Sequence, residues 1–278
     1  MLAHPSPKET AVALQPPSAN SAARGAASDA PGALRSDSHL ILQTRQSQRL
    51  VEGRKSEDGK SSIVGLTGFA ALLRSVWNGA RSGDPYADWW LIRVQDAIEE
   101  STTELAALKD HVEGALRDLS GMSVTVAQSI QPISLPLTFS NPYAFRGAFL
   151  LARYDEVVRG ILTARHVAVF DRDTSERLLA EGGRHVRRAF NAALGYRFLG
   201  INRDDVSLMT ARGKQAESVM GLLPKEIFEG QLQPAHRPER GAGFKIRLSV
   251  KTAVPAAAPA SDGPVPAPSD GSDAAPAA

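Results

Sequence analysis

The sequence contains no cysteine among its 278 residues. This absence excludes disulfide bonds, thiolate zinc sites, iron–sulfur clusters and cysteine nucleophiles, and it is typical of a protein from a reducing compartment. No run of about 18 apolar residues occurs, and the first 17 residues lack the apolar core of a signal peptide. We therefore expect a soluble, cytoplasmic protein with no membrane partner.

Motifs for catalysis and cofactor binding are also missing. The sequence has no Gly-x-Ser-x-Gly or Gly-x-Gly-x-x-Gly motif, and its six histidines are dispersed without a His-x-x-x-His pair. The stretch Gly53–Ser61 resembles a phosphate-binding P-loop, but five residues separate its glycines where four are required. We therefore predict that the protein is not an enzyme and has no catalytic residue, metal, cofactor or small-molecule substrate.

The two ends of the chain differ in composition from the rest. Residues 253–278 include 10 Ala, 6 Pro and no Lys or Arg, and residues 1–33 are rich in Ala, Ser and Pro. Such segments cannot bury enough apolar surface to offset the entropy of ordering, so we expect disordered tails at 1–33 and 253–278. A single folded domain is predicted over 34–252. The chain carries +2, the C-terminal tail −3 and the first 33 residues zero, which leaves +5 on the domain and favours an anionic partner.

Periodicity predicts a mainly helical α+β domain with a few short strands. The first part, 34–120, begins with an alternating stretch that predicts a strand over 40–46, with Gln43 and Arg45 on one face. A charged, glycine-containing segment over 49–61 predicts a loop, with a helical turn over 46–51 as an alternative. Apolar residues three and four apart then predict a helix over 63–78.

The longest periodic pattern predicts one long helix over 86–119. Apolar residues repeat every seven positions and form an a/d seam of about four heptads, with Ser101 as its one polar member. So long a helix needs a partner, which is either the same chain folded back or a second copy in a dimer. The seam comprises Leu91, Val94, Ile98, Leu105, Leu108, Val112, Ala115 and Leu119.

The second part, 121–252, mixes short strands with further helices. Strands are predicted over 124–126, 133–139 and 244–250, the last with a basic face, and helices over 142–169, 173–194 and 202–219. Basic residues gather in the early loop around Arg49, in the helix over 173–194 with Arg184, Arg187 and Arg188, and in residues 235–251. A run of charge is usually a solvated face, but three such groups can also merge into one surface that contacts phosphate.

Several sequence blocks resemble a known family. They include L-I-L-Q-T-R-Q-S-Q-R-L (40–50), D-P-Y-A-D-W-W-L-I-R (84–93), F-S-N-P-Y-A-F-R-G-A-F-L-L-A-R-Y-D (139–155) and E-G-G-R-H-V-R-R-A-F (181–190). In this order the blocks resemble integrating conjugative element proteins grouped with AcaB-like transcriptional regulators. The likeness covers most of 34–230 and leaves both tails outside.

This resemblance implies a homodimeric, ribbon–helix–helix regulator of conjugation genes that binds double-stranded DNA. In such a dimer one strand from each chain pairs with its mate and lies in the major groove. The matching strand is 40–46, which makes Gln43 and Arg45 the expected base readers, since Gln pairs with adenine and Arg with guanine. The expected phosphate contacts are Arg49, Arg184, Arg187 and Arg188.

Two alternatives stay open. Sixteen residues separate Gln46 from Ile63, whereas a ribbon–helix–helix passes from strand to helix almost at once, so the strands over 133–139 and 244–250 are rival readers. The alternative function is an accessory protein of the conjugative transfer system that binds no DNA and acts through a helical protein–protein interface. Salt dependence separates the two functions, because DNA binding weakens steeply with added salt.

Overall fold

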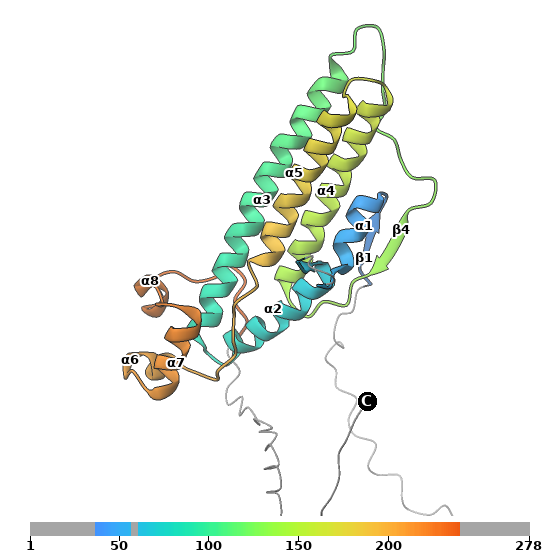
Figure 1. Ribbon diagram of the computed structural model, residues 1–278. Coiled ribbons are helices and arrows are strands. Elements are labelled where there is room, and N and C mark those ends of the chain that lie inside the picture. Colours follow the sequence, from blue (N-terminus) through green and yellow to red (C-terminus); the bar gives the residue numbers. More distant parts are fainter. Residues whose placement is uncertain (1–36, 57–60, 240–278) are drawn as a thin grey trace, which may run out of the picture.

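A computed structural model describes residues 37–56 and 61–239 of the chain (Figure 1). Within these residues it has eight helices and two separate two-stranded antiparallel sheets. This architecture confirms the predicted mainly helical α+β class. The predicted tails, residues 57–60 of the predicted loop and the predicted strand over 244–250 lie outside the described residues.

The longest connections between elements are residues 118–132, between α3 and β4, and residues 192–202, between α5 and α6. One sheet pairs β1 with β4, with His39 opposite Pro136 and Leu42 opposite Ile133, and the other pairs β2 with β3. The helices are α1 (Arg45–Glu52), α2 (Leu66–Arg81), α3 (Pro85–Arg117), α4 (Pro142–His166), α5 (Arg172–Asn191), α6 (Arg203–Ser207), α7 (Ala211–Met220) and α8 (Lys225–Phe228). The strands are β1 (His39–Leu42), β2 (Gly53–Arg54), β3 (Ile63–Val64) and β4 (Ile133–Pro136).

The long helices α3, α4 and α5 lie side by side and form the body of the protein (Figure 1). The heptad seam of α3 from Leu91 to Val112 is buried, and it faces α4 and α5 of the same chain. Its one polar member, Ser101, donates its hydroxyl to the carbonyl of His185 on α5 at 3.0 Å. The partner of the long helix is therefore the chain itself, which was one of the two alternatives.

Capping residues set where these helices begin. Asp84 and Asn141 accept hydrogen bonds from backbone amides at the start of α3 and α4, and each is followed by a proline at the first helical position. Asp171 caps α5 through the amide of Thr174, two residues before the predicted start at 173. Side-chain acceptors at these ends satisfy amides that have no partner inside the helix.

Several predicted elements differ from the structure. Residues 124–126 form no strand, and β4 ends at Pro136 rather than at the predicted residue 139, with the amide of Leu137 adding one more hydrogen bond to the carbonyl of Ser38. The predicted helix over 202–219 is divided into α6 and α7 by a turn at Met209, whose φ is +49°. α1 and β2 take residues 49–54 of the predicted loop, so the alternative of a helical turn over 46–51 is confirmed. β3 takes the first two residues of the predicted helix over 63–78, and α2 begins at Leu66.

Candidate nucleic-acid interface

The two predicted base readers, Gln43 and Arg45, lie in the junction between β1 and α1 and not in the strand. β1 ends at Leu42, and Thr44 is the N-cap of α1, with its hydroxyl oxygen accepting from the amide of Ser47 at 3.3 Å. Gln43 therefore lies in a two-residue connection, and Arg45 is the first residue of a helix. The prediction of a strand over 40–46 is wrong in its second half.

A buried carboxylate on α4 causes this break. Asp155 is 4% exposed, and its Oδ2 accepts from the amide of Gln43 at 2.9 Å. Its Oδ1 accepts from the amide of Thr44 at 3.0 Å and from the Thr44 hydroxyl at 2.6 Å. Since Asp155 takes these two amides, they cannot continue the strand ladder, and the chain turns into α1 instead.

The ribbon itself carries different chemistry from the one predicted. β1 pairs with β4 of the same chain, and the exposed positions of this pair are His39, Ile41, Ser134 and Pro136. None of them is a guanidinium or carboxamide side chain of the kind that reads base edges. The side chain of Gln43 is half-buried, and its Oε1 accepts from the amide of Ser129 at 2.9 Å.

Arginines from α1 and α5 meet where the two helices approach the β2–β3 pair. Arg49 of α1, Arg54 of β2 and Arg187 of α5 line one cavity of about 380 Å³, so residues 138 positions apart in sequence share one site. Arg45 lies one helical turn from Arg49, and Arg184 lies one turn from Arg187. We refer to these five residues, Arg45, Arg49, Arg54, Arg184 and Arg187, as the arginine surface.

Among the described residues, no carboxylate forms an ion pair with the guanidinium groups of this surface. No Asp or Glu of the described ranges lines the cavity either. Arg54 donates to the carbonyl of Ser61 at 3.0 Å. Arg188 differs from its neighbours, because its Nη1 lies 2.9 Å from the carboxylate of Glu100 on α3. Of the four predicted phosphate contacts, the structure thus brings Arg49, Arg184 and Arg187 to one surface and pairs Arg188 with α3.

Two adjacent glycines in α5 shape the floor of the cavity. A Cβ at Gly182 would lie 2.9 Å from the ring of Tyr154, and a Cβ at Gly183 would lie 3.0 Å from Nη1 of Arg187. Because neither glycine has a Cβ atom, the ring of Tyr154 and the guanidinium of Arg187 can pack closely against α5. The Tyr154 hydroxyl donates to the carbonyl of Leu179 at 3.2 Å, and burial raises its pKa to about 12 against the opposing charge of Arg187. Tyr154 is therefore neutral at physiological pH.

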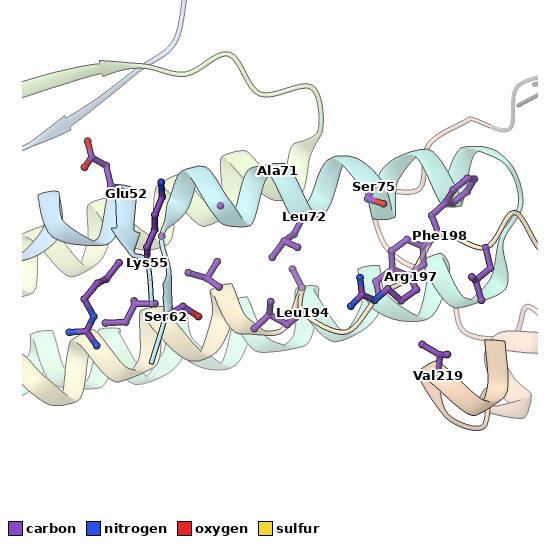
Figure 2. A pocket seen from close by; sticks show the side chains of 18 of the residues that line it. Glu52, Lys55, Ser62, Ala71, Leu72, Ser75, Leu194, Arg197, Phe198 and Val219 are labelled. Atoms are coloured by element: carbon purple, nitrogen blue, oxygen red, sulfur yellow. The ribbon is translucent and has the colours of Figure 1, made fainter. Parts of the chain in front are cut away.

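A larger groove lies on the other side of the β2–β3 pair (Figure 2). Its volume is about 1010 Å³, and it runs between α2 and the segment 193–199, with Ala71, Leu72 and Leu194 among its apolar lining. Arg54 and Ile63 line both this groove and the smaller cavity. The β2–β3 pair therefore separates two hollows that share a guanidinium.

The predicted contacts left out four residues of this site, namely Gln46, Arg54, Tyr154 and Gly183. Gln46 was assigned to the predicted strand over 40–46, and Arg54 to the predicted loop over 49–61. Tyr154 has no local signal, because its role comes from packing against α5. The two adjacent glycines inside a predicted helix were the available signal. Glycine lowers helix stability, so a doublet in mid-helix indicates a close approach of another group.

The described residues hold neither a metal-binding cluster nor a membrane-spanning helix. No group of three or more His, Cys, Asp or Glu side chains in residues 37–56 and 61–239 is placed to hold a metal ion. Over the same ranges, none of the helices combines the length and the apolar character that crossing a bilayer requires.

Comparisons with known proteins agree with the resemblance in the sequence blocks. The model of the family "Transcriptional regulator AcaB" matches residues 30–240. A crystal structure of selenomethionine-containing AcaB from uropathogenic E. coli has the same fold, with a TM-score of 0.50, 14% sequence identity and coverage of 69% of this chain and 93% of that chain. No curated protein matches the sequence. Because the family match spans well over half of its residues, the chain belongs to the AcaB family of transcriptional regulators.

Proposed function

We propose that this AcaB family member binds double-stranded DNA through the arginine surface and regulates conjugation genes of an integrative conjugative element. The observation that carries the proposal is the gathering of five guanidinium groups from α1, β2 and α5 without a carboxylate partner among the described residues. The family supplies the regulatory role. The arginine surface supplies the chemistry that a nucleic acid requires.

Guanidinium groups suit DNA phosphates for a geometric reason. Each presents a planar fork of donors that matches two phosphate oxygens, and it stays charged at any physiological pH. Contacts of this kind fix the position of a protein on the duplex and carry no sequence information. We assign this role to Arg49, Arg184 and Arg187, while the ion pair with Glu100 leaves Arg188 in a structural role.

Base reading is better served by α1 than by the β1–β4 ribbon. α1 exposes Arg45, Gln48 and Arg49, which lie three and four residues apart and so share one face. Arginine reads guanine and glutamine reads adenine in the major groove, which accommodates a helix. We propose that Arg45 contacts a base, and that Gln43, whose amide oxygen binds Ser129, holds the connection before α1.

Salt dependence of DNA binding tests the phosphate contacts. We expect the logarithm of the affinity for duplex DNA to fall with the logarithm of salt concentration with a slope of about −4, which corresponds to four or five phosphates. The double variant Arg49→Gln/Arg184→Gln should reduce that slope by about two. The matched control is Arg172→Gln, an exposed arginine at the start of α5 that pairs with Glu176. An equal change of slope in this control would contradict the proposal.

The base contact needs the cognate site. Chromatin immunoprecipitation of the tagged protein on its host element would supply that sequence. On the cognate duplex, Arg45→Ala should then weaken binding by about 1–3 kcal/mol while leaving non-specific binding nearly unchanged. An equal loss on every sequence would make Arg45 a phosphate contact. The homodimer stays a prediction, and sedimentation with and without the duplex measures it directly.

The alternative of an accessory protein with a helical interface loses its main support. That alternative rested on the heptad seam of α3, and the seam is buried against α4 and α5 within one chain. A helix whose apolar stripe is already covered has no such stripe left to bind another protein.

A further inference from the structure

A half-open cavity lies beneath the arginine surface, with a buried floor. Tyr154 at its floor is 3% exposed and Arg187 is half-buried. Its volume of about 380 Å³ falls within the range of small-ligand sites, which is about 300–1,000 Å³. The cavity therefore has room for a molecule the size of a small metabolite.

The lining of this cavity selects for an anion with several oxygen atoms. Three arginines reach it from three different elements, α1, β2 and α5, and within the described parts of the chain no carboxylate lines it. Gln46 adds a carboxamide, while Leu50 and Ile63 form an apolar wall. Three guanidinium forks match the three terminal oxygens of a phosphate monoester, which also carries close to two negative charges.

One of these guanidinium groups packs closely against the helix that carries it. Gly183 leaves room for Nη1 of Arg187 to lie against α5, where a Cβ would approach it to 3.0 Å. The hydroxyl of Tyr154 also borders this space, at 3.3 Å from the same Cβ position. A cation that is already oriented loses less freedom on binding, which strengthens the interaction.

We propose that this cavity is a phosphate-binding site that takes the phosphate group of a small ester such as a nucleoside monophosphate. The phosphate of a DNA backbone has the same chemistry and is the second source. Because Arg49 belongs both to the cavity and to the exposed face of α1, a bound ester would change the affinity of the outer surface for DNA. The proposal does not rest on DNA binding, since the ester is measured alone.

Calorimetric titration of the full chain tests the site. The probes are inorganic phosphate and adenosine monophosphate, each at constant ionic strength, with chloride as the reference anion. We expect saturable binding of both phosphates and a loss of about tenfold or more in affinity for Arg187→Gln, since hydrogen bonds to charged groups are the strong ones. Arg188→Gln is the matched control, because Arg188 is the next residue of α5 and pairs with Glu100 outside the cavity. Equal losses in the two variants, or no saturable binding, would overturn the proposal.

A second variant leaves every charge in place. Gly183→Ala should weaken phosphate binding by displacing the guanidinium of Arg187, while Gly114→Ala in α3, which has open space around its Cβ position, should not. Both substitutions favour the helix, so a folding defect is not expected from either. Unchanged affinity in Gly183→Ala together with unchanged affinity in Arg187→Gln would refute the site.

Competition with duplex DNA identifies the source of the phosphate. If the ester and the DNA exclude one another and both depend on Arg187, the cavity binds a backbone phosphate. If both bind together, the cavity holds a free ester as an effector. If DNA binding fails altogether while the ester still binds in an Arg187-dependent way, the proposed function is wrong and the phosphate site stands.

Discussion

Two charged regions of the molecule differ in whether their arginines are paired with a carboxylate. At the start of α3, Asp88 is 1% exposed, and Arg237 and Arg203 lie 2.5 Å and 3.5 Å from its Oδ2. At the arginine surface the guanidinium groups of α1, β2 and α5 have no carboxylate partner among the described residues. In the first region arginine connects distant parts of the chain through Asp88, and in the second the described residues supply no carboxylate partner for it.

The paired region connects parts that are far apart in sequence. Arg203 begins α6 and also donates to the carbonyl of Ile227, and Arg237 lies near the end of the described chain. Both reach Asp88 on the first turn of α3. Neighbouring Asp84 accepts from the hydroxyl of Tyr196 at 2.8 Å. The acidic residues here therefore anchor the segments that follow α5 to the helical body.

Breaking the paired region should have the largest effect on stability. Asp88→Ala leaves two largely buried guanidinium groups without their carboxylate, which we expect to lower the free energy of unfolding by about 3–5 kcal/mol. Chemical denaturation measures this change. The control is Glu99→Ala, which removes the exposed partner of Arg146 and should cost less than about 1 kcal/mol. Similar losses in the two variants would remove the distinction between buried and exposed pairs.

The arginine surface has its own buried acid, which acts on the backbone. Asp155→Ala removes three hydrogen bonds to Gln43 and Thr44 and should cost about 3 kcal/mol, since two amides lose their acceptor. The same variant should weaken DNA binding, because Asp155 fixes the start of α1 and so the position of Arg45. Full DNA affinity in a folded Asp155→Ala protein would show that α1 needs no such support.

The paired region also contains a carboxyl group, Asp84, whose pKa is shifted. Burial raises the pKa of Asp84 from 3.8 to about 6, against the opposing hydrogen bonds from Tyr196 and from the backbone amides of Tyr86 and Ala87. A raised pKa in the folded state means that this group favours folding below about pH 4 and that its contribution is lost as the pH rises through 6.

Urea denaturation of the wild type and Asp84→Asn from pH 4 to pH 7 measures this effect. The stability of the wild type relative to the variant should fall by an amount on the order of 2–3 kcal/mol across that window, at 1.36 kcal/mol for each unit of pKa. A difference that stays constant, or rises with pH, would contradict the assignment.

The smallest effect compares two neighbouring arginines on one helix. Arg184→Gln should reduce the salt slope of DNA binding by about one and leave stability unchanged. Arg188→Gln should leave the slope nearly unchanged and cost less than about 1 kcal/mol, because its pair with Glu100 is exposed. Equal slopes in the two variants would mean that the unpaired and paired arginines do not differ in role.

The helices that could be predicted from the sequence are those whose apolar spacing and capping residues lie within the helix or next to it. The heptad repeat placed α3, and the Asn141–Pro142 pair placed the start of α4, because apolar spacing and capping are written within a few residues of where they act. Thr44 followed by Ser47 is a similar signal for the start of α1. The alternating stretch from Leu40 onward obscured it.

The candidate site depends on long-range contacts that no local pattern contains. Gln43 alternates correctly for a strand, but Asp155, 112 positions later, takes its amide. Arg49 and Arg187 were each predicted to contact phosphate, yet nothing in their neighbourhoods indicates that they line one cavity. The pairing of Arg188 with Glu100 likewise depends on how α5 packs on α3.

The long reach of Asp155 has a consequence for how each new molecule is made. Ribosomes add about 5–20 residues per second, so the 112 residues between Gln43 and Asp155 take roughly 6–20 s to synthesise. During that interval the first helix has been translated but lacks the acceptor that fixes its beginning. The part of the arginine surface on α1 and β2 is thus translated before α4, which fixes the start of α1, and before α5, which supplies Arg184 and Arg187.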